Sequence, residues 1–185
     1  MRETEATVFI VDDETAVLEG LEALLESVRL RVEIYLAAED FFRNYDVSRP
    51  GCLILDVRMP RISGMEVYRR LREQGSEIPV IFLCGHADIP TAVAAMREGA
   101  FDFLEKPVHD QYLIDRVHAA MALDRDTRRH NAERDALAAR IETLSDRELE
   151  VVHHLMAGKT SKAIARDLGV GLKTVDFHRA NIMRK

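Results

Sequence analysis

The sequence predicts an α/β domain, built as a (βα)5 doubly wound parallel sheet, then a long helical linker and a small all-α domain. Three observations predict this organisation. Short apolar runs alternate with helical patterns up to about residue 120, and no glycine or proline interrupts residues 108–143. Residues 144–185 contain short helical patterns joined by a glycine-rich turn. Strands that alternate with helices are typical of a parallel sheet, whereas short helices around a tight turn are typical of a small bundle.

Five short runs have the composition of strands: Thr7–Val11, Arg31–Tyr35, Cys52–Leu55, Pro79–Leu83 and Phe101–Leu104. The first, third and fourth runs are apolar throughout, which is typical of parallel strands that helices cover on both faces. Apolar stripes with helical spacing run from Val17 to Val28 and from Met65 to Leu71. In such sheets ligands bind at the carboxyl ends of the strands, so the residues that follow each strand are the first candidates for a site.

Charged residues follow three of these strands. Asp12 and Asp13 follow the first strand, Asp56 the third and Lys106 the fifth. We expect them to converge at one edge of the sheet. Clustered carboxylates repel one another unless a hard cation lies among them, and Mg²⁺ prefers carboxylate, carbonyl and water oxygens. A helix N-cap is the alternative for any single aspartate, but the combination with the lysine favours a magnesium site.

The net charge of −6 conceals a division along the chain. Residues 1–120 carry 13 Lys and Arg against 22 Asp and Glu, residues 121–143 are neutral, and residues 144–185 carry 8 basic against 5 acidic residues. An acidic module therefore precedes a basic one. Two cysteines are too few for a disulfide framework, and the adjacent His153 and His154 lack the spacing of a zinc site. No apolar run is long enough to cross a bilayer, so we expect a cytoplasmic protein without a membrane partner.

Three motifs of the acidic module resemble those of a known family: Val11-Asp12-Asp13, Leu55-Asp56-Val57-Arg58-Met59-Pro60 and Glu105-Lys106-Pro107. Through them residues 6 to about 120 resemble the receiver domain of two-component response regulators, and residues 85–90 (GHADIP) are similar to its FixJ-type subgroup. The resemblance implies a flavodoxin-like strand order, 2-1-3-4-5, as in CheY. It implies that a sensor histidine kinase phosphorylates Asp56. It also implies that Asp12, Asp13, Asp56 and the carbonyl of Arg58 arrange Mg²⁺, and that Lys106 marks the phosphorylated state.

Three other positions bear on the switch that the resemblance implies. Phe103 falls at the switch aromatic of the family, with a plain core aromatic as the alternative. Cys84 stands where the family has Ser or Thr, whose hydroxyl donates to a phosphoryl oxygen. Because a thiol is a weak donor, we expect looser coupling between phosphorylation and the switch. A redox role and a substitution without regulatory effect are the alternatives for Cys84. His86 and Arg58 occupy positions that tune dephosphorylation in the family, and for His86 an exposed loop histidine is the alternative.

The linker and the start of the basic module have separate signals. Residues 108–143 form one helical stretch, in which Leu123–Asn131 is almost wholly polar, as suits a connector between domains; a dimerising coiled coil is the alternative. Ser145 and Glu148 form a capping box that opens a helix. The sequence then predicts helices over residues 160–168 and 174–185, separated by a turn at residues 169–171, which is a helix-turn-helix pattern.

Motifs of the basic module, among them Leu144-Ser145, Ala157-Gly158-Lys159 and Lys173-Thr174-Val175, resemble the LuxR-type DNA-binding domain. The expected DNA contacts are Lys173, Thr174, Asp176, Phe177, Arg179 and Ala180. Asp176 could accept from cytosine N4 and Phe177 could contact a thymine methyl, whereas Lys173, Thr174 and Arg179 suit phosphates. The alternative for Asp176 is that it only keeps the helix soluble. LuxR-type domains have a fourth helix, so we expect the sequence, which ends at Lys185, to be truncated.

Together these features predict a transcriptional regulator, not an enzyme, in which phosphorylation of Asp56 promotes homodimerisation and binding to promoter DNA. RNA polymerase is a further candidate partner. One alternative is a Mg²⁺-dependent phosphohydrolase, but such enzymes have alternate aspartates after the first strand, whereas Asp12 and Asp13 are adjacent. The other is a receiver that acts as a phosphorylation-independent dimerisation module, which Cys84 favours.

Overall fold

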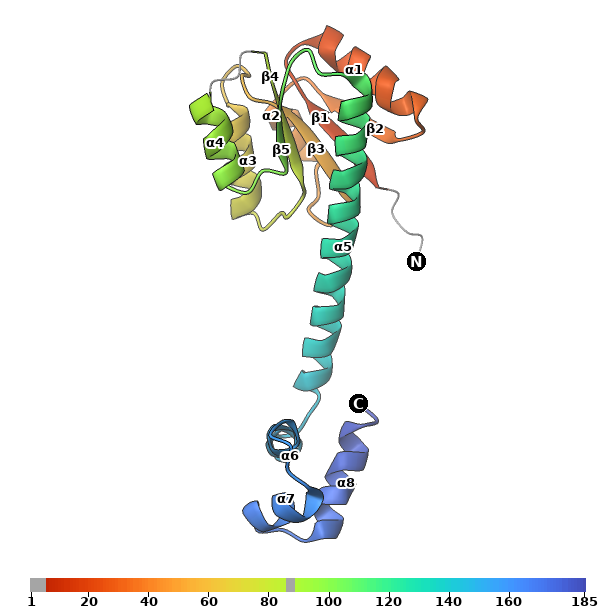
Figure 1. The fold of residues 1–185 in the computed structure, drawn as a ribbon, viewed down its shortest axis with the longest axis vertical. Helices are drawn as coiled ribbons and strands as arrows, with labels where there is room; N and C mark the ends of the chain where they lie inside the picture. Colours follow the sequence, from red (N-terminus) through yellow and green to blue (C-terminus); the bar gives the residue numbers. More distant parts are fainter. Residues whose placement is uncertain (1–5, 86–88) are drawn as a thin grey trace. The chain divides into compact units, whose positions relative to one another are not determined.

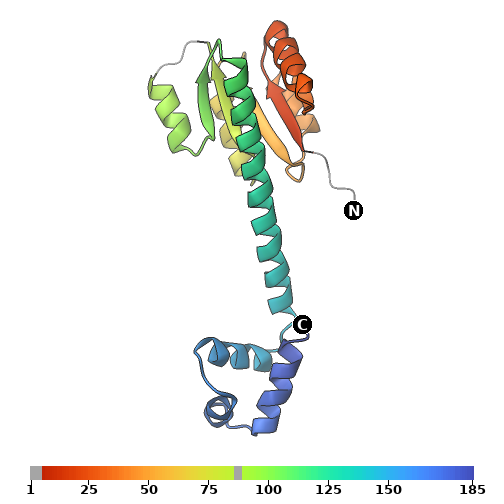
Figure 2. The ribbon, with the colours of Figure 1, turned by 45° about the vertical axis from the view of Figure 1, so that its right-hand side comes forward.

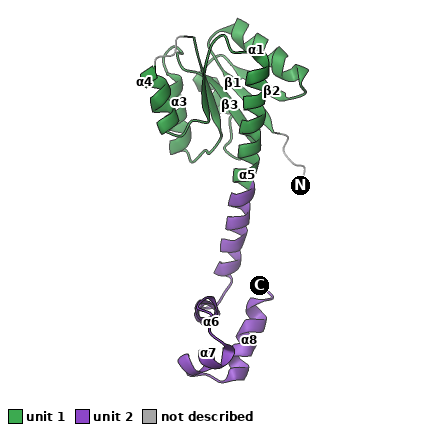
Figure 3. Ribbon diagram, viewed as in Figure 1, with its two compact units in different colours: residues 1–128 green, residues 129–185 purple. Residues whose placement is uncertain are grey.

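The computed structural model describes residues 6–85 and 89–185, which form two compact units. The first unit comprises residues 1–128 and the second residues 129–185 (Figure 3). The units therefore divide within a single helix, at Arg128, whereas the charge division of the sequence was placed at residue 120.

The first unit contains a five-stranded sheet. Its strands are β1 (Thr7–Val11), β2 (Arg31–Tyr35), β3 (Gly51–Asp56), β4 (Val80–Cys84) and β5 (Asp102–Glu105). All neighbours pair in parallel, in the order β2-β1-β3-β4-β5. Every residue of β1, β3 and β4 is buried, whereas β2 and β5 at the edges are partly exposed. The predicted fold class and strand order are confirmed, and the apolar strands are the central ones because both of their faces are covered.

Helices cover both faces of this sheet. They are α1 (Thr15–Ser27), α2 (Ala38–Asn44), α3 (Gly64–Glu73), α4 (Ile89–Arg97) and α5 (Asp110–Glu142). One face carries α1 and α5, and the other carries α2, α3 and α4 (Figures 1 and 2). Because side chains alternate along a strand, Val8 and Ile10 pack under α1 and α5, whereas Phe9 and Val11 join the opposite core. Each fully buried side chain of this size stabilises the fold by roughly 2 kcal/mol.

The second unit is a small helical bundle of α6 (Asp146–Met156), α7 (Ser161–Asp167) and α8 (Leu172–Ile182). Its core consists of Val151, Ile164, Ala165 and Val175. The predicted capping box is present: the Glu148 amide donates to Ser145 Oγ at 3.3 Å, and the Ser145 amide donates to Glu148 Oε2 at 2.9 Å. Helix α8 begins two residues earlier than predicted because Gly171, in extended conformation, occupies its N-cap.

None of the helices in the described part of the chain is both long enough and apolar enough to cross a membrane.

Candidate functional site

Asp12, Asp56 and Lys106 converge at the carboxyl edge of the sheet. The Lys106 ammonium lies 2.6 Å from Asp12 Oδ2 and 2.6 Å from Asp56 Oδ1. The Asp12 and Asp56 side chains are 2% and 8% exposed, and the Lys106 side chain is 18% exposed. A single cation therefore bridges two buried carboxylates that are 44 residues apart in the chain.

Backbone groups fix the orientation of each carboxylate. Asp12 Oδ1 accepts a hydrogen bond from the Glu14 amide at 3.0 Å, and Asp56 Oδ2 accepts one from the Arg58 amide at 2.6 Å. Helix α3 begins against the Asp56 backbone at Gly64, where a β-carbon would lie 2.2 Å from the Asp56 carbonyl oxygen. A glycine is required at this position because no side chain fits between the helix and the strand.

Two effects act on the charge of Lys106. Burial lowers the pKa of Lys106, but the hydrogen bonds to Asp12 and Asp56 raise it by more, so the pKa lies above its ordinary value. The backbone supports the same position, since the Lys106 amide donates to the Cys84 carbonyl at 2.9 Å. The Lys106–Pro107 peptide bond is cis. Lys106 is therefore protonated at neutral pH and places its positive charge between the two carboxyl groups.

The other residues expected at the magnesium site lie around this cluster. Asp13 and Arg58 are exposed on the loops that follow β1 and β3. Among the described residues no three His, Cys, Asp or Glu side chains lie close enough together to hold a metal ion, and Lys106 contacts both Asp12 and Asp56. The donor chemistry nevertheless fits Mg²⁺, since carboxylate and carbonyl oxygens are the ligands that this ion prefers.

The residues expected at the switch have different environments. Cys84 is buried at the end of β4, in the core beneath α2, α3 and α4. Phe103 on β5 is half-buried, and the centre of its ring lies 6.1 Å from that of Phe82. Phe103 also lines a surface pocket of about 460 Å³ beside Val93 and Met96 of α4. His86 lies outside the described residues.

Helix α8 presents the expected DNA-contacting residues on its surface. Val175 is fully buried, and Ile182 packs against the same core. The side chains of Lys173, Thr174, Asp176, Phe177, Arg179 and Ala180 are exposed. Phe177 is 60% exposed, so its ring is accessible to a partner.

Arg179 has a contact that the sequence did not predict. Its guanidinium donates to Ser161 Oγ at 2.6 Å, next to the Thr160 cap of α7. The two helices of the helix-turn-helix pattern are therefore also joined by a polar contact.

Sequence reasoning missed Gly64 and the pair Asp124 and Arg128. Gly64 forms no motif by itself, and its role is visible only once α3 is packed against β3. The pair had a weak signal, because an aspartate four residues before an arginine on a helix can form an ion pair. The surrounding polar stretch made that pair look like ordinary solvated surface.

Comparison with known proteins agrees with the two units. Residues 8–118 match the response regulator receiver domain, and residues 142–185 match the family described as bacterial regulatory proteins, luxR family. The chain is 42% identical over 185 residues to the response regulator protein TodT of Pseudomonas putida, covering 100% of this chain and 82% of TodT. It is 42% identical over 181 residues to the transcriptional regulatory protein FixJ of Azorhizobium caulinodans, covering 96% of this chain and 84% of FixJ.

Solved structures give the same result. The response regulator StyR matches with a TM-score of 0.90 and 38% identity, over 97% of this chain and 91% of StyR. Full-length FixJ from B. japonicum matches with a TM-score of 0.62 and 35% identity, over 98% of this chain and 89% of FixJ. Both family matches are regulatory modules, so the phosphohydrolase alternative is set aside. The chain thus belongs to the response regulators that join a receiver domain to a LuxR-type DNA-binding domain, and it is a transcriptional regulator rather than an enzyme.

Proposed function

We propose that a sensor histidine kinase phosphorylates this regulator on Asp56 and that phosphorylation promotes homodimerisation and binding to promoter DNA. The observation that carries the proposal is the position of Lys106 Nζ, 2.6 Å from Asp56 Oδ1 and 2.6 Å from Asp12 Oδ2. A cation held against Asp56 at the end of its strand is suited to stabilise a phosphoryl group on that carboxylate.

The residues can support the transfer as follows. A carboxylate oxygen of Asp56 attacks the phosphorus of a phosphohistidine; the P–O bond forms as the P–N bond breaks, and the leaving imidazole nitrogen keeps the electron pair and takes up a proton. A carboxylate is a weak nucleophile, so the rate depends on positioning, which the Arg58 amide provides by holding Asp56 Oδ2 at 2.6 Å. Lys106 offers its charge to the phosphoryl oxygens.

Magnesium binding is part of the same proposal. The carboxylates of Asp12, Asp13 and Asp56 and the carbonyl of Arg58 would hold Mg²⁺, which neutralises charge on the phosphoryl oxygens when it is bound. Lys106 shares two of these carboxylates, so the ammonium and the metal ion compete for them. Receiver domains generally bind Mg²⁺ at such an acidic pocket, and this chemistry supports the assignment.

The response to phosphorylation would involve Cys84 and Phe103. A phosphoryl group on Asp56 would accept a weak hydrogen bond from the Cys84 thiol and change the conformation of the loop that follows β4. The pocket beside Phe103, with Val93 and Met96 at its edge, gives the ring space to move. Such a movement would alter the face formed by α4 and β5, which we propose as the surface that dimerises.

Promoter binding would use the exposed residues of α8. Asp176 and Phe177 would contact base edges, with Ala180 beside them, whereas Lys173, Thr174 and Arg179 would contact phosphates. A net charge of +3 on residues 144–185 supports only modest nonspecific affinity for a single copy, so dimerisation would raise the affinity. RNA polymerase remains a further proposed partner at the promoter.

The test is to incubate the chain with Mg²⁺ and acetyl phosphate. Phosphate at Asp56 is located by mass spectrometry, and the affinity for a promoter fragment is measured in parallel. We expect label on Asp56 and a rise in affinity, with both effects absent in Asp56→Asn. Asp115→Asn, on an exposed face of α5, is the matched control and keeps both effects. Label without a rise in affinity would contradict the proposed switch.

A second candidate function is favoured by Cys84, which lacks the hydroxyl expected at its position. In that case the receiver dimerises without phosphorylation, and the affinity for promoter DNA is already high in Asp56→Asn. The same experiment separates the two candidates. We also propose residues 1–120 as the receiver domain, residues 121–143 as the linker and residues 144–185 as the DNA-binding domain.

A further inference from the structure

Helix α5 packs apolar side chains against the receiver core as far as Met121, and beyond that residue a polar contact still attaches it to the receiver. The buried residues of α5 are Leu113, Ile114, Val117, Ala120 and Asp124. The last of them is a carboxylate, 3% exposed. A buried carboxylate strongly destabilises a fold unless it is paired and hydrogen-bonded, so its neighbours have to compensate for it.

Asp124 is fully compensated by two partners. Asp124 Oδ2 accepts a hydrogen bond from the Gly51 amide, at the first residue of β3, at 2.9 Å. The guanidinium Nε of Arg128, one turn further along α5, donates to both carboxylate oxygens, at 2.8 Å and 3.0 Å. The helix is thereby joined to the start of the central strand.

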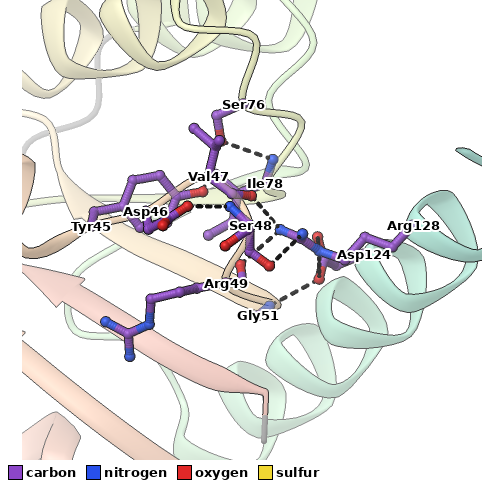
Figure 4. A network of polar contacts seen from close by, with 10 residues as sticks. All are labelled: Tyr45, Asp46, Val47, Ser48, Arg49, Gly51, Ser76, Ile78, Asp124 and Arg128. Carbon is purple, nitrogen blue, oxygen red and sulfur yellow. Dashed lines mark hydrogen bonds and ion pairs between the residues drawn. The ribbon is translucent and has the colours of Figure 1, made fainter. Parts of the chain in front are cut away.

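Arg128 also binds the loop between α2 and β3 through its remaining donors. It donates to the carbonyl oxygens of Val47 at 3.1 Å, Ser48 at 3.0 Å and Arg49 at 2.7 Å (Figure 4). Three carbonyl groups thus point at one guanidinium. A planar group with five fixed donors suits this arrangement, whereas a lysine ammonium could not reach all the acceptors at once.

The loop that receives Arg128 is itself well held. Tyr45 Oη lies 2.8 Å from Ser76 Oγ, and the Ser48 amide donates to Asp46 Oδ1 at 2.7 Å. The Arg49 side chain points the other way and forms two bonds with Glu33 on β2, at 2.6 Å and 2.9 Å. Arg128 therefore docks on a rigid surface.

We propose that Asp124 and Arg128 form a clamp that fixes residues 121–128, the first part of the proposed linker, to the receiver, so that a change in the receiver reaches the rest of the linker helix. The clamp lies at the end of β3 opposite Asp56, and the first compact unit ends at Arg128. This inference rests on the proposed function for its regulatory consequence, whereas its structural part does not depend on phosphorylation.

The physical reason is the low intrinsic stability of this segment. Residues 121–128 lie in the middle of α5 but bury no apolar side chain fully, and a helical segment with few tertiary contacts opens locally more easily than a packed one. A segment that opens would absorb a movement of the receiver instead of passing it on. The clamp replaces missing apolar contacts with charge-assisted hydrogen bonds.

The test uses Arg128→Lys in the full chain, because a lysine keeps a positive charge beside Asp124 while it loses most of the bonds to the loop. Asp124→Asn is the second variant, since its amide oxygen can still accept from the Gly51 amide. Arg125→Lys is the matched control, because Arg125 is exposed on the same turn.

Hydrogen exchange of the unphosphorylated chain comes first. We expect the amides of residues 121–128 to exchange about tenfold faster in Arg128→Lys, because one or two charge-assisted bonds are lost. The amides of β3 should exchange at an unchanged rate in this variant. In Arg125→Lys the amides of residues 121–128 should also exchange at the native rate. Unchanged protection of this segment in both clamp variants would overturn the inference.

The second measurement is the ratio of promoter affinities with and without phosphate on Asp56. We expect this ratio to fall about fivefold or more in Arg128→Lys, at an unchanged rate of phosphorylation, which is the lower range of typical coupling between sites. If the clamp variants keep the same ratio of promoter affinities as the native chain, the clamp does not couple the receiver to the DNA-binding domain. If the ratio is 1 in the native chain, the proposed function fails instead, and hydrogen exchange alone decides on the clamp.

Discussion

Replacement of Lys106 by methionine tests the electrostatics of the cluster directly. Lys106 Nζ lies 2.6 Å from an oxygen of Asp12 and 2.6 Å from an oxygen of Asp56, so these two oxygens are at most about 5.2 Å apart. Two unit charges at that distance repel each other by about 3 kcal/mol at an effective dielectric constant of about 20. Breaking a buried ion pair by removing one partner costs a similar amount, roughly 3–5 kcal/mol.

We therefore expect Lys106→Met to lose about 3 kcal/mol of unfolding free energy at pH 7 in the presence of a chelator. Urea denaturation followed by tyrosine fluorescence is the assay, since the chain has no tryptophan and its four tyrosines, Tyr35, Tyr45, Tyr68 and Tyr112, all lie in the first unit. The signal then reports the receiver alone.

Two further measurements make the reasoning refutable. Because the ammonium and Mg²⁺ compete for the same carboxylates, added Mg²⁺ should stabilise Lys106→Met more than it stabilises the native chain. The double variant Lys106→Met, Asp12→Asn removes one of the two repelling charges and should recover most of the lost stability. If Lys106→Met without Mg²⁺ stays within about 1 kcal/mol of the native chain, the two carboxylates do not interact as the distances indicate.

Three other changes have defined outcomes. Cys84→Thr should increase the dimeric fraction at equal phosphorylation, measured by analytical ultracentrifugation; equal fractions would contradict the weak-donor argument. Gly64→Ala should slow phosphorylation of Asp56 by about tenfold or more, since its β-carbon meets the Asp56 carbonyl at 2.2 Å, whereas Gly20→Ala, with nothing within 4 Å, keeps the rate. Bonds from Lys185 and Ser145 lower the pKa of Glu148 to about 2, so Glu148 stabilises α6 fully above about pH 4.5 and loses this effect as the pH falls toward 2. In the native chain the amides of α6 should therefore lose protection from hydrogen exchange as the pH falls from about 4.5 toward 2, and Glu148→Gln should abolish this pH dependence. The same pH profile of protection in Glu148→Gln and the native chain would refute the role of Glu148.

The sequence predicted the α/β architecture well because its central strands are apolar throughout and its strand ends carry charge. The structure confirms the strand order. The predicted limits of β1 and β2 agree with the observed ones, and those of β3, β4 and β5 differ by one residue at each end. The sequences of α2 and α4 show no clear apolar stripe, and the reason is visible in α4, where Ala95 is the only buried residue of this described helix. A helix that buries so little has a weak periodic signal.

The candidate site was predicted as a set of residues, but not as an arrangement. That Asp12, Asp56 and Lys106 would meet follows from parallel strands, whose carboxyl ends share one edge of the sheet. That Lys106 bridges the two carboxylates, while Asp13 stays exposed, depends on side-chain positions that no pattern in the chain expresses. The exposed residues of α8 were predictable, because a buried Val175 determines which face of the helix packs on the core and which face remains exposed to solvent.

Local periodicity and residue type are enough to predict the two modules, their fold classes and the residues that carry charge to the carboxyl edge of the sheet. Where the first unit ends depends instead on contacts between distant segments. Asp124 and Arg128 lie in a polar stretch that is typical of solvated helix, yet they contact Gly51 and residues 47–49, more than 70 residues earlier in the chain. A contact of that kind leaves no local pattern, because both partners are polar and the pairing exists only once the loop and the helix have been brought together by the fold.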